Sequence, residues 1–130
     1  MKFLCLICAE KVVEQMPEAT AEQHMADYQL FTEILRSSGQ LVDCNRLTPP
    51  ATAATIRVRN GKVSRTDGPF AETKEQLGGY FVIEAADMEE AIAVAERIPG
   101  AWIGCVEVRP IAEDPATRQA LGFADPDGAR

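Results

Sequence analysis

The chain has 130 residues, 46% of them apolar and 25% charged, a composition typical of one globular domain with a hydrophobic core. Its formal net charge of −7 argues against binding nucleic acid through phosphates and against docking on anionic membranes, since both need a basic surface. No apolar stretch approaches the length of a membrane span. We therefore expect a cytoplasmic protein without nucleic-acid or membrane partners.

The first apolar run covers the seven residues 3–9 before Glu10, within and just beyond an expected first strand over residues 2–8. It is short for a signal peptide and no small-residue cleavage site follows, so a buried first strand explains it better. Cys5 and Cys8 have the C-x-x-C spacing of metal and redox sites, but residues three apart in a strand point to opposite faces. We expect these thiols, with Cys44 and Cys105, to be reduced and free of metal.

A first helix is expected from Thr20, whose spacing from Gln23 fits a capping box, to a stop at Gly39. Apolar residues recur at helical spacing between these ends, at Met25, Tyr28, Phe31, Ile34 and Leu35. A second strand is expected over residues 40–47, and a Thr-Pro-Pro segment ends it.

The strongest hairpin signal is Asn60-Gly61, which lies between expected strands at residues 55–59 and 62–65. Arginines alternate with apolar residues in the first of these strands, so the hairpin has one basic face. A basic face can bind an anion, and Arg57 is the ligand-binding candidate there. A solvated strand face is the simpler interpretation of the same pattern.

The second half of the chain repeats the order strand, helix, strand. A strand is expected over residues 80–84, a helix from Asp87 through Arg97, and a last strand over residues 104–108. The two β-α-β units predict an α+β, ferredoxin-like split β-α-β sandwich with an inserted β-hairpin. Both helices then cover one face of the sheet, and the other face needs a partner.

The composition changes after Ile111, which we take as the end of a domain spanning residues 1–111. Residues 112–130 form an expected C-terminal extension. Asp114-Pro115 can start a short helix there and Gly122 can end it, before a frayed tail.

The loop over residues 66–80 has the densest mix of turn formers and ionisable groups in the chain. Asp67-Gly68-Pro69 is turn chemistry, and Gly78-Gly79 permits a close backbone approach. Thr73 and Gln76 have the spacing of a capping box, so we expect a short helical turn to begin at Thr73.

Three ionisable residues are catalytic candidates. Asp67 and Glu72 lie five apart in the loop, and paired carboxylates of different burial can divide the roles of acid and base. His24, the single histidine, falls on the apolar face of the first helix and can act as a general base. Lys74 can hold an anionic substrate group. A self-capping loop, with Asp67 bonding backbone amides and Glu72 pairing with Lys74 or an arginine, and a packing histidine are the alternatives.

Asp67-Gly68-Pro69-Phe70, followed by the Ala-Glu-Thr-Lys-Glu-Gln-Leu-Gly-Gly of residues 71–79, resembles the signature of DGPF-domain proteins of the YCII-related family. The resemblance extends upstream to residues 55–63 and downstream to residues 106–110. It implies a ferredoxin-like domain that pairs as a dimeric α/β barrel, and hence a homodimer. Phe70, inside the signature, and Tyr28, near where related sequences often carry a polar residue, are therefore ligand-binding candidates.

The resemblance does not define a reaction. The wider superfamily includes cofactor-free lyases and isomerases, so one hypothesis is an enzyme that acts on a small molecule by general acid-base chemistry. DGPF proteins also resemble partners of extracytoplasmic-function sigma factors, so the alternative is a non-catalytic ligand-binding or regulatory module. A purely structural oligomer is the third possibility. We expect no cofactor, because the sequence has no phosphate loop or dinucleotide fingerprint.

Overall fold

The computed structural model describes residues 1–10 and 15–123. Its centre is a four-stranded antiparallel sheet in the order β2-β5-β1-β6. The strands are β1 (Lys2–Glu10), β2 (Leu41–Arg46), β5 (Glu75–Glu84) and β6 (Cys105–Pro110). The predicted α+β, ferredoxin-like class is confirmed.

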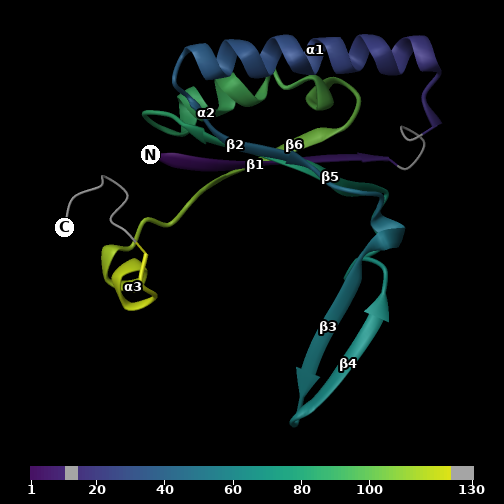
Figure 1. Ribbon diagram of the computed structural model, residues 1–130, viewed down its shortest axis with the longest axis vertical. Helices are drawn as coiled ribbons and strands as arrows, with labels where there is room; N and C mark the ends of the chain where they lie inside the picture. The colour runs from purple at the N-terminus through teal and green to yellow at the C-terminus, as the bar shows by residue number, and fades with distance from the viewer. Residues whose placement is uncertain (11–14, 124–130) are drawn as a thin grey trace.

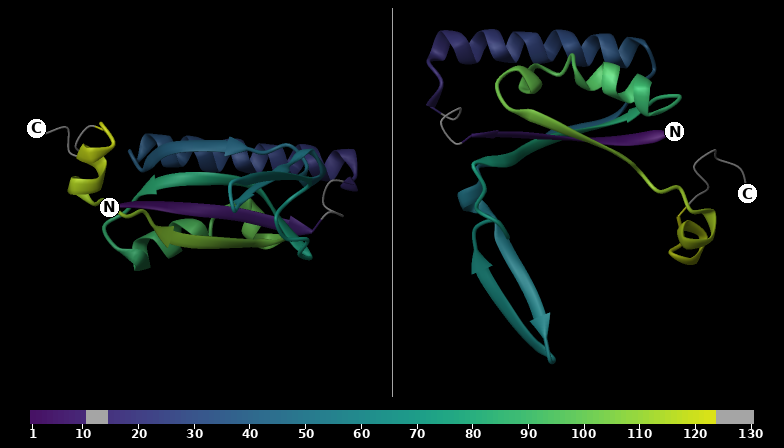
Figure 2. Two further views of the ribbon diagram at one scale, coloured as in Figure 1. Left: turned by 90° about the horizontal axis from the view of Figure 1, so that it is seen from below. Right: turned by 180° about the vertical axis from the view of Figure 1, so that it is seen from behind.

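Both long helices cover the same face of this sheet (Figure 1). Helix α1 (Glu18–Ser37) lies behind the β2 edge and α2 (Met88–Ala95) behind the β6 edge (Figure 2). Side chains alternate along a strand, so every second residue points at the helices. The core is formed by Phe3, Cys5, Phe31, Leu35, Phe81, Ile83, Ala85, Ala91, Val94, Ala95 and Ile98. Met25 and Ile34 of the expected apolar stripe are about half exposed instead.

The two helices begin differently. Asp87 caps α2 as predicted, since its Oδ1 accepts a hydrogen bond from the amide of Glu90 at 2.9 Å. The capping box predicted at Thr20 is wrong. Helix α1 starts at Glu18 after Pro17, whose φ of −54° already suits the entry to a helix. Thr20 therefore lies inside the first turn, and Gln23 donates to Asp27.

The inserted hairpin is a separate two-stranded sheet of β3 (Ala54–Arg59) and β4 (Lys62–Asp67). It projects from the side of the main sheet opposite the helices (Figure 1). Asn60 and Gly61 have φ of 52° and 74°, so the predicted hairpin turn is confirmed. A single-turn helix, η2 (Pro50–Thr52), precedes the hairpin.

The helical turn predicted at Thr73 is wrong. The Gln76 side chain does donate to Thr73 Oγ1 at 2.9 Å, but it also donates to the carbonyl oxygens of Ala71 and Thr73. The backbone is extended from Glu75 onward because Glu75 pairs with Glu10 of β1. Pairing across the sheet thus prevails over the local helix signal.

The remaining segments are short. Turn η3 (Pro99–Trp102) follows α2, and α3 (Pro115–Ala120) follows β6. Asp114 caps α3, as expected, by accepting from the amide of Ala116. The amide of Ile111 donates to the carbonyl of Lys2 at 2.9 Å, so Ile111 is still hydrogen-bonded to β1. The boundary between a domain of residues 1–111 and an extension of residues 112–130 stays a prediction. None of the helices in the described residues is long and apolar enough to cross a membrane.

Candidate functional site at the open face of the sheet

Asp67 is the last residue of β4, and its side chain is 85% exposed. Its Oδ1 lies 3.4 Å from Arg65 Nη2, whereas the turn after it is held by the backbone. The Gly68 amide donates to the Ala53 carbonyl at 2.7 Å, and Thr55 Oγ1 donates to the Gly68 carbonyl at 2.8 Å. The alternative in which Asp67 bonds backbone amides is therefore wrong.

The other loop candidates also face solvent. Lys74 Nζ pairs with Glu10 Oε1 at 3.3 Å rather than with Glu72. Among the described residues, Glu72 has no hydrogen bond or ion pair. Phe70 is 81% exposed, and Arg57 is exposed on the hairpin. In the part of the chain that the structure describes, all of the loop and hairpin candidates are therefore exposed.

His24 lies on the helix side of the sheet. Its ring packs edge-on against Tyr28, with centroids 4.9 Å apart. The Tyr28 hydroxyl accepts a hydrogen bond from the Gly100 amide at 3.0 Å. Burial raises the pKa of Tyr28, and this hydrogen bond opposes the rise. Because the hairpin projects from the other side (Figure 1), one chain does not bring His24 to Asp67.

A hydrogen-bonded group that the sequence did not single out lies on the open face, the side of the sheet away from the helices. The Tyr80 hydroxyl accepts from Asn45 Nδ2 at 2.8 Å and donates to Asp43 Oδ2 at 3.5 Å. Register explains the contact, because Asn45 is paired with Tyr80 across β2 and β5. Alternation puts Tyr80 on this face, since the next residue, Phe81, is buried under the helices.

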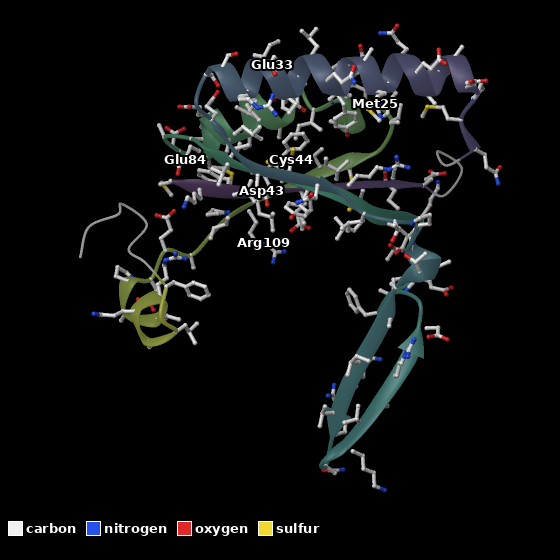
Figure 3. All side chains as sticks on the ribbon, in the orientation of Figure 1. Met25, Glu33, Asp43, Cys44, Glu84 and Arg109 are labelled. Carbon is white, nitrogen blue, oxygen red and sulfur yellow. The ribbon has the colours of Figure 1, made fainter. Side chains whose placement is uncertain are left out.

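The opposite margin of the open face carries an ion pair between Arg109 and Glu107, with 2.6 Å between Nη2 and Oε2. Figure 3 shows Arg109 on the side away from the α1 residues Met25 and Glu33. Three half-buried apolar residues, Leu4, Leu6 and Val82, lie between the two margins. The open face is therefore an apolar floor with polar groups along both edges.

This arrangement suits proton transfer to or from a small molecule. Asn45 donates to the Tyr80 hydroxyl at 2.8 Å, and Asp43 Oδ2 lies within 3.5 Å as the acceptor for the hydroxyl proton, a long contact. Arg109 supplies a positive charge for an anionic oxygen. Within residues 1–10 and 15–123, no group of three or more His, Cys, Asp and Glu side chains is arranged to hold a metal ion.

Comparison with known proteins identifies the family. The YCII-related domain matches residues 1–115, and the chain belongs to the YCII-related family. An uncharacterized protein of Rhizobium meliloti (strain 1021) is 37% identical over 105 residues, covering 79% of this chain and 85% of that protein. The resemblance inferred from the Asp67 loop is thus confirmed.

A solved structure with the same fold is the 5-chloro-2-hydroxyhydroquinone dehydrochlorinase (TftG) of Burkholderia phenoliruptrix AC1100, in complex with 2,5-dihydroxybenzoquinone. The TM-score is 0.52, and the match covers 89% of this chain and 98% of that one. The sequence identity is 15%, so the similarity establishes the fold, that of the dimeric α/β barrels, and nothing further.

Proposed function

We propose that this protein is a cofactor-free lyase or isomerase that acts by general acid-base chemistry on a small hydroxylated ring compound. The observation that carries the proposal is the Asn45–Tyr80–Asp43 group at the edge of an apolar sheet face. Ligand sites are mostly apolar with a few placed polar groups, and the open face has this character.

The size of the open face suggests the substrate class. Strands β5 and β6 are separated by β1 and lie about 10 Å apart, and Arg109 lies two residues beyond Glu107, the residue level with Tyr80. The proposed ligand is a single six-membered ring with oxygens on opposite carbons, which can make hydrogen bonds of about 2.8 Å to both margins. The complex of TftG with 2,5-dihydroxybenzoquinone, a ring of this kind, makes the same class reasonable here.

In the proposed reaction, the Tyr80 hydroxyl exchanges a proton with the ring while Asp43 takes or returns the hydroxyl proton. In an isomerase the proton removed at one atom is returned at another. In a lyase the electron pair left by the departing proton forms the new double bond as the leaving group departs. Arg109 stabilises the negative charge that develops on the far oxygen.

The proposed assembly is a homodimer in which a second copy covers the apolar floor of the open face and leaves the end of the sheet at Cys8 and Cys105 uncovered. Ile56, Val58 and Val63 are each more than half exposed on the hairpin, which extends on the same side of the sheet as the apolar floor (Figure 1). The hairpin strands carry four basic residues and one acidic residue, and the carboxylates of Asp43 and Glu107 lie on the margins of the open face, so contact between two copies can pair opposite charges. Burying both apolar surfaces at once favours a closed, symmetric pair.

In the proposed homodimer, the loop over residues 66–80 of one copy reaches the site on the other copy. We propose that Asp67, Phe70, Glu72, Lys74 and Arg57 of one copy form the rim of the site on the other. His24 and Tyr28 lie under the sheet in both copies and support the core. The loop would then act on a ligand across the interface rather than within its own chain.

Incubation with 5-chloro-2-hydroxyhydroquinone, followed by measurement of chloride release, tests the lyase form of the proposal. Wild-type protein should release chloride, and Tyr80→Phe should lose most of that rate while keeping its melting temperature. Saturable binding without turnover across a panel of halogenated and unhalogenated hydroxyquinols would favour the non-catalytic binding module instead.

A further inference from the structure

Cys8 and Cys105 are direct neighbours across β1 and β6, although 97 positions separate them in the chain. Paired residues in antiparallel strands have Cα atoms about 4.5–5.5 Å apart. A disulfide requires about 4.4–6.8 Å between the same atoms. Both side chains lie on the open face. Cys5 and Ile7 point toward the helices, so Leu6 and Cys8 point the other way, and Cys105 shares the face of Cys8 because the two residues are paired.

The backbone holds the two residues together. The strands approach so closely at Gly104 that an added Cβ would overlap the carbonyl oxygen of Cys8. Burial is the largest cause that raises the pKa of each thiol, and the carboxylate of Glu75 adds to the rise, second in size at Cys105 and smallest at Cys8. Glu107 raises the pKa of Cys8 further, whereas a hydrogen bond with Cys105 opposes the rise.

The other thiols are too distant to bridge. Cys5 points into the core and faces Val108 on β6. Cys44 lies on β2, at the opposite edge from Cys105, and three inter-strand spacings make about 14 Å. Phe81 separates Cys44 from Cys5 across the sheet. Of the four cysteines, these two alone are paired directly across neighbouring strands on one face of the sheet.

We propose that Cys8 and Cys105 form a cross-strand dithiol that small organic disulfides convert to an intramolecular disulfide. The thiolate of exposed Cys105 attacks the small disulfide, forming a mixed disulfide and releasing one thiolate. The Cys8 thiolate then attacks the Cys105 sulfur and displaces the second. The protein loses two hydrogens, and the small disulfide is reduced to two thiols.

The experiment uses the full-length protein and oxidised glutathione at about pH 8.5, where more of each thiol is ionised. The protein is then unfolded in denaturant, the remaining thiols are alkylated, and the mass is measured without reduction. The wild type should retain two alkylatable thiols of its four, with a peptide containing Cys8 linked to one containing Cys105. Its melting temperature should rise, because the closed loop restricts the unfolded chain.

Matched variants make the result specific. Cys44→Ser should oxidise like the wild type. Cys8→Ser should stop at a stable mixed disulfide on Cys105. The proposal is overturned if the wild type keeps all thiols reactive, accumulates only mixed disulfides, or links to Cys5 or Cys44. The experiment measures a mass and needs no substrate. A negative result would therefore contradict the disulfide proposal without bearing on the proposed catalytic function.

Discussion

The amide of Gly100 donates a hydrogen bond of 3.0 Å to the Tyr28 hydroxyl and so joins turn η3 to the middle of helix α1. Residue 100 must be a glycine, because there is no room for a side chain at this position. An added Cβ there would lie 2.5 Å from the Tyr28 hydroxyl oxygen and 2.6 Å from Ile7 Cγ2. This hydrogen bond thus ties helix α1 to turn η3.

Tyr28→Phe should lower the free energy of unfolding by about 1–3 kcal/mol, because the Gly100 amide loses its partner in a buried position. Gly100→Ala should also destabilise, through overlap with Tyr28 and Ile7. Urea unfolding of each variant measures both effects. If Tyr28→Phe has the same free energy of unfolding as the wild type, the hydrogen bond makes no net contribution to stability.

Stability at alkaline pH should depend on Cys5. Burial raises the pKa of this thiol from 9.0 to about 11, so the folded state keeps a proton that the unfolded state has lost. Stability is therefore full below pH 9 and falls as the pH rises toward 11, by roughly 3 kcal/mol for a shift of this size. Cys5→Ala should show a shallower decline than the wild type in urea titrations across this range. Parallel curves would contradict the assignment.

Asp67→Asn should leave the free energy of unfolding unchanged within about 0.5 kcal/mol, because the side chain is exposed and its ion pair with Arg65 lies at the surface. If the loop forms the rim of the partner's site, the same change should weaken ligand affinity severalfold. Melting temperature and affinity of this one variant separate the roles. A loss of about 0.5–2 kcal/mol would indicate a capping role after all.

Leu6→Asp should convert a homodimer to a monomer, because it places a charge in the middle of the apolar face that the second copy covers. Leu30→Asp is the matched control, since Leu30 is 63% exposed on the outer surface of α1. Light scattering at micromolar concentration should give twice the chain mass of 14.2 kDa for the wild type and the control. A monomeric wild type would refute the assembly.

Sequence patterns predicted the fold well where local signals and strand pairing agree. Asn60-Gly61 and Asp87 each dictate a local geometry, and the structure has the turn and the cap. The signal at Thr73 failed because the pairing of Glu75 with Glu10 competes with it, and sequence spacing does not contain that pairing.

The candidate site was harder to predict for the same reason. Tyr80 meets Asn45, and Cys8 meets Cys105, through strand register alone. No spacing within the sequence brings either pair together. Cys5 and Cys8 point to opposite faces of the sheet, as their spacing in a strand predicted, yet the neighbour of Cys8 across the strands is far along the chain. The alternation of Tyr80 with buried neighbours was the one available hint that it faces outward.

The two tyrosines provide the most direct test of the proposed site, because they lie on opposite sides of the sheet. Affinity for 2,5-dihydroxybenzoquinone should be measured by calorimetry for the wild type, Tyr80→Phe and Tyr28→Phe. Loss of the Tyr80 hydroxyl should weaken binding about tenfold, the factor that corresponds to about 1.4 kcal/mol. Tyr28→Phe should lower the melting temperature and leave the affinity unchanged. Equal affinity in wild type and Tyr80→Phe, or a loss in Tyr28→Phe alone, would contradict a site on the open face.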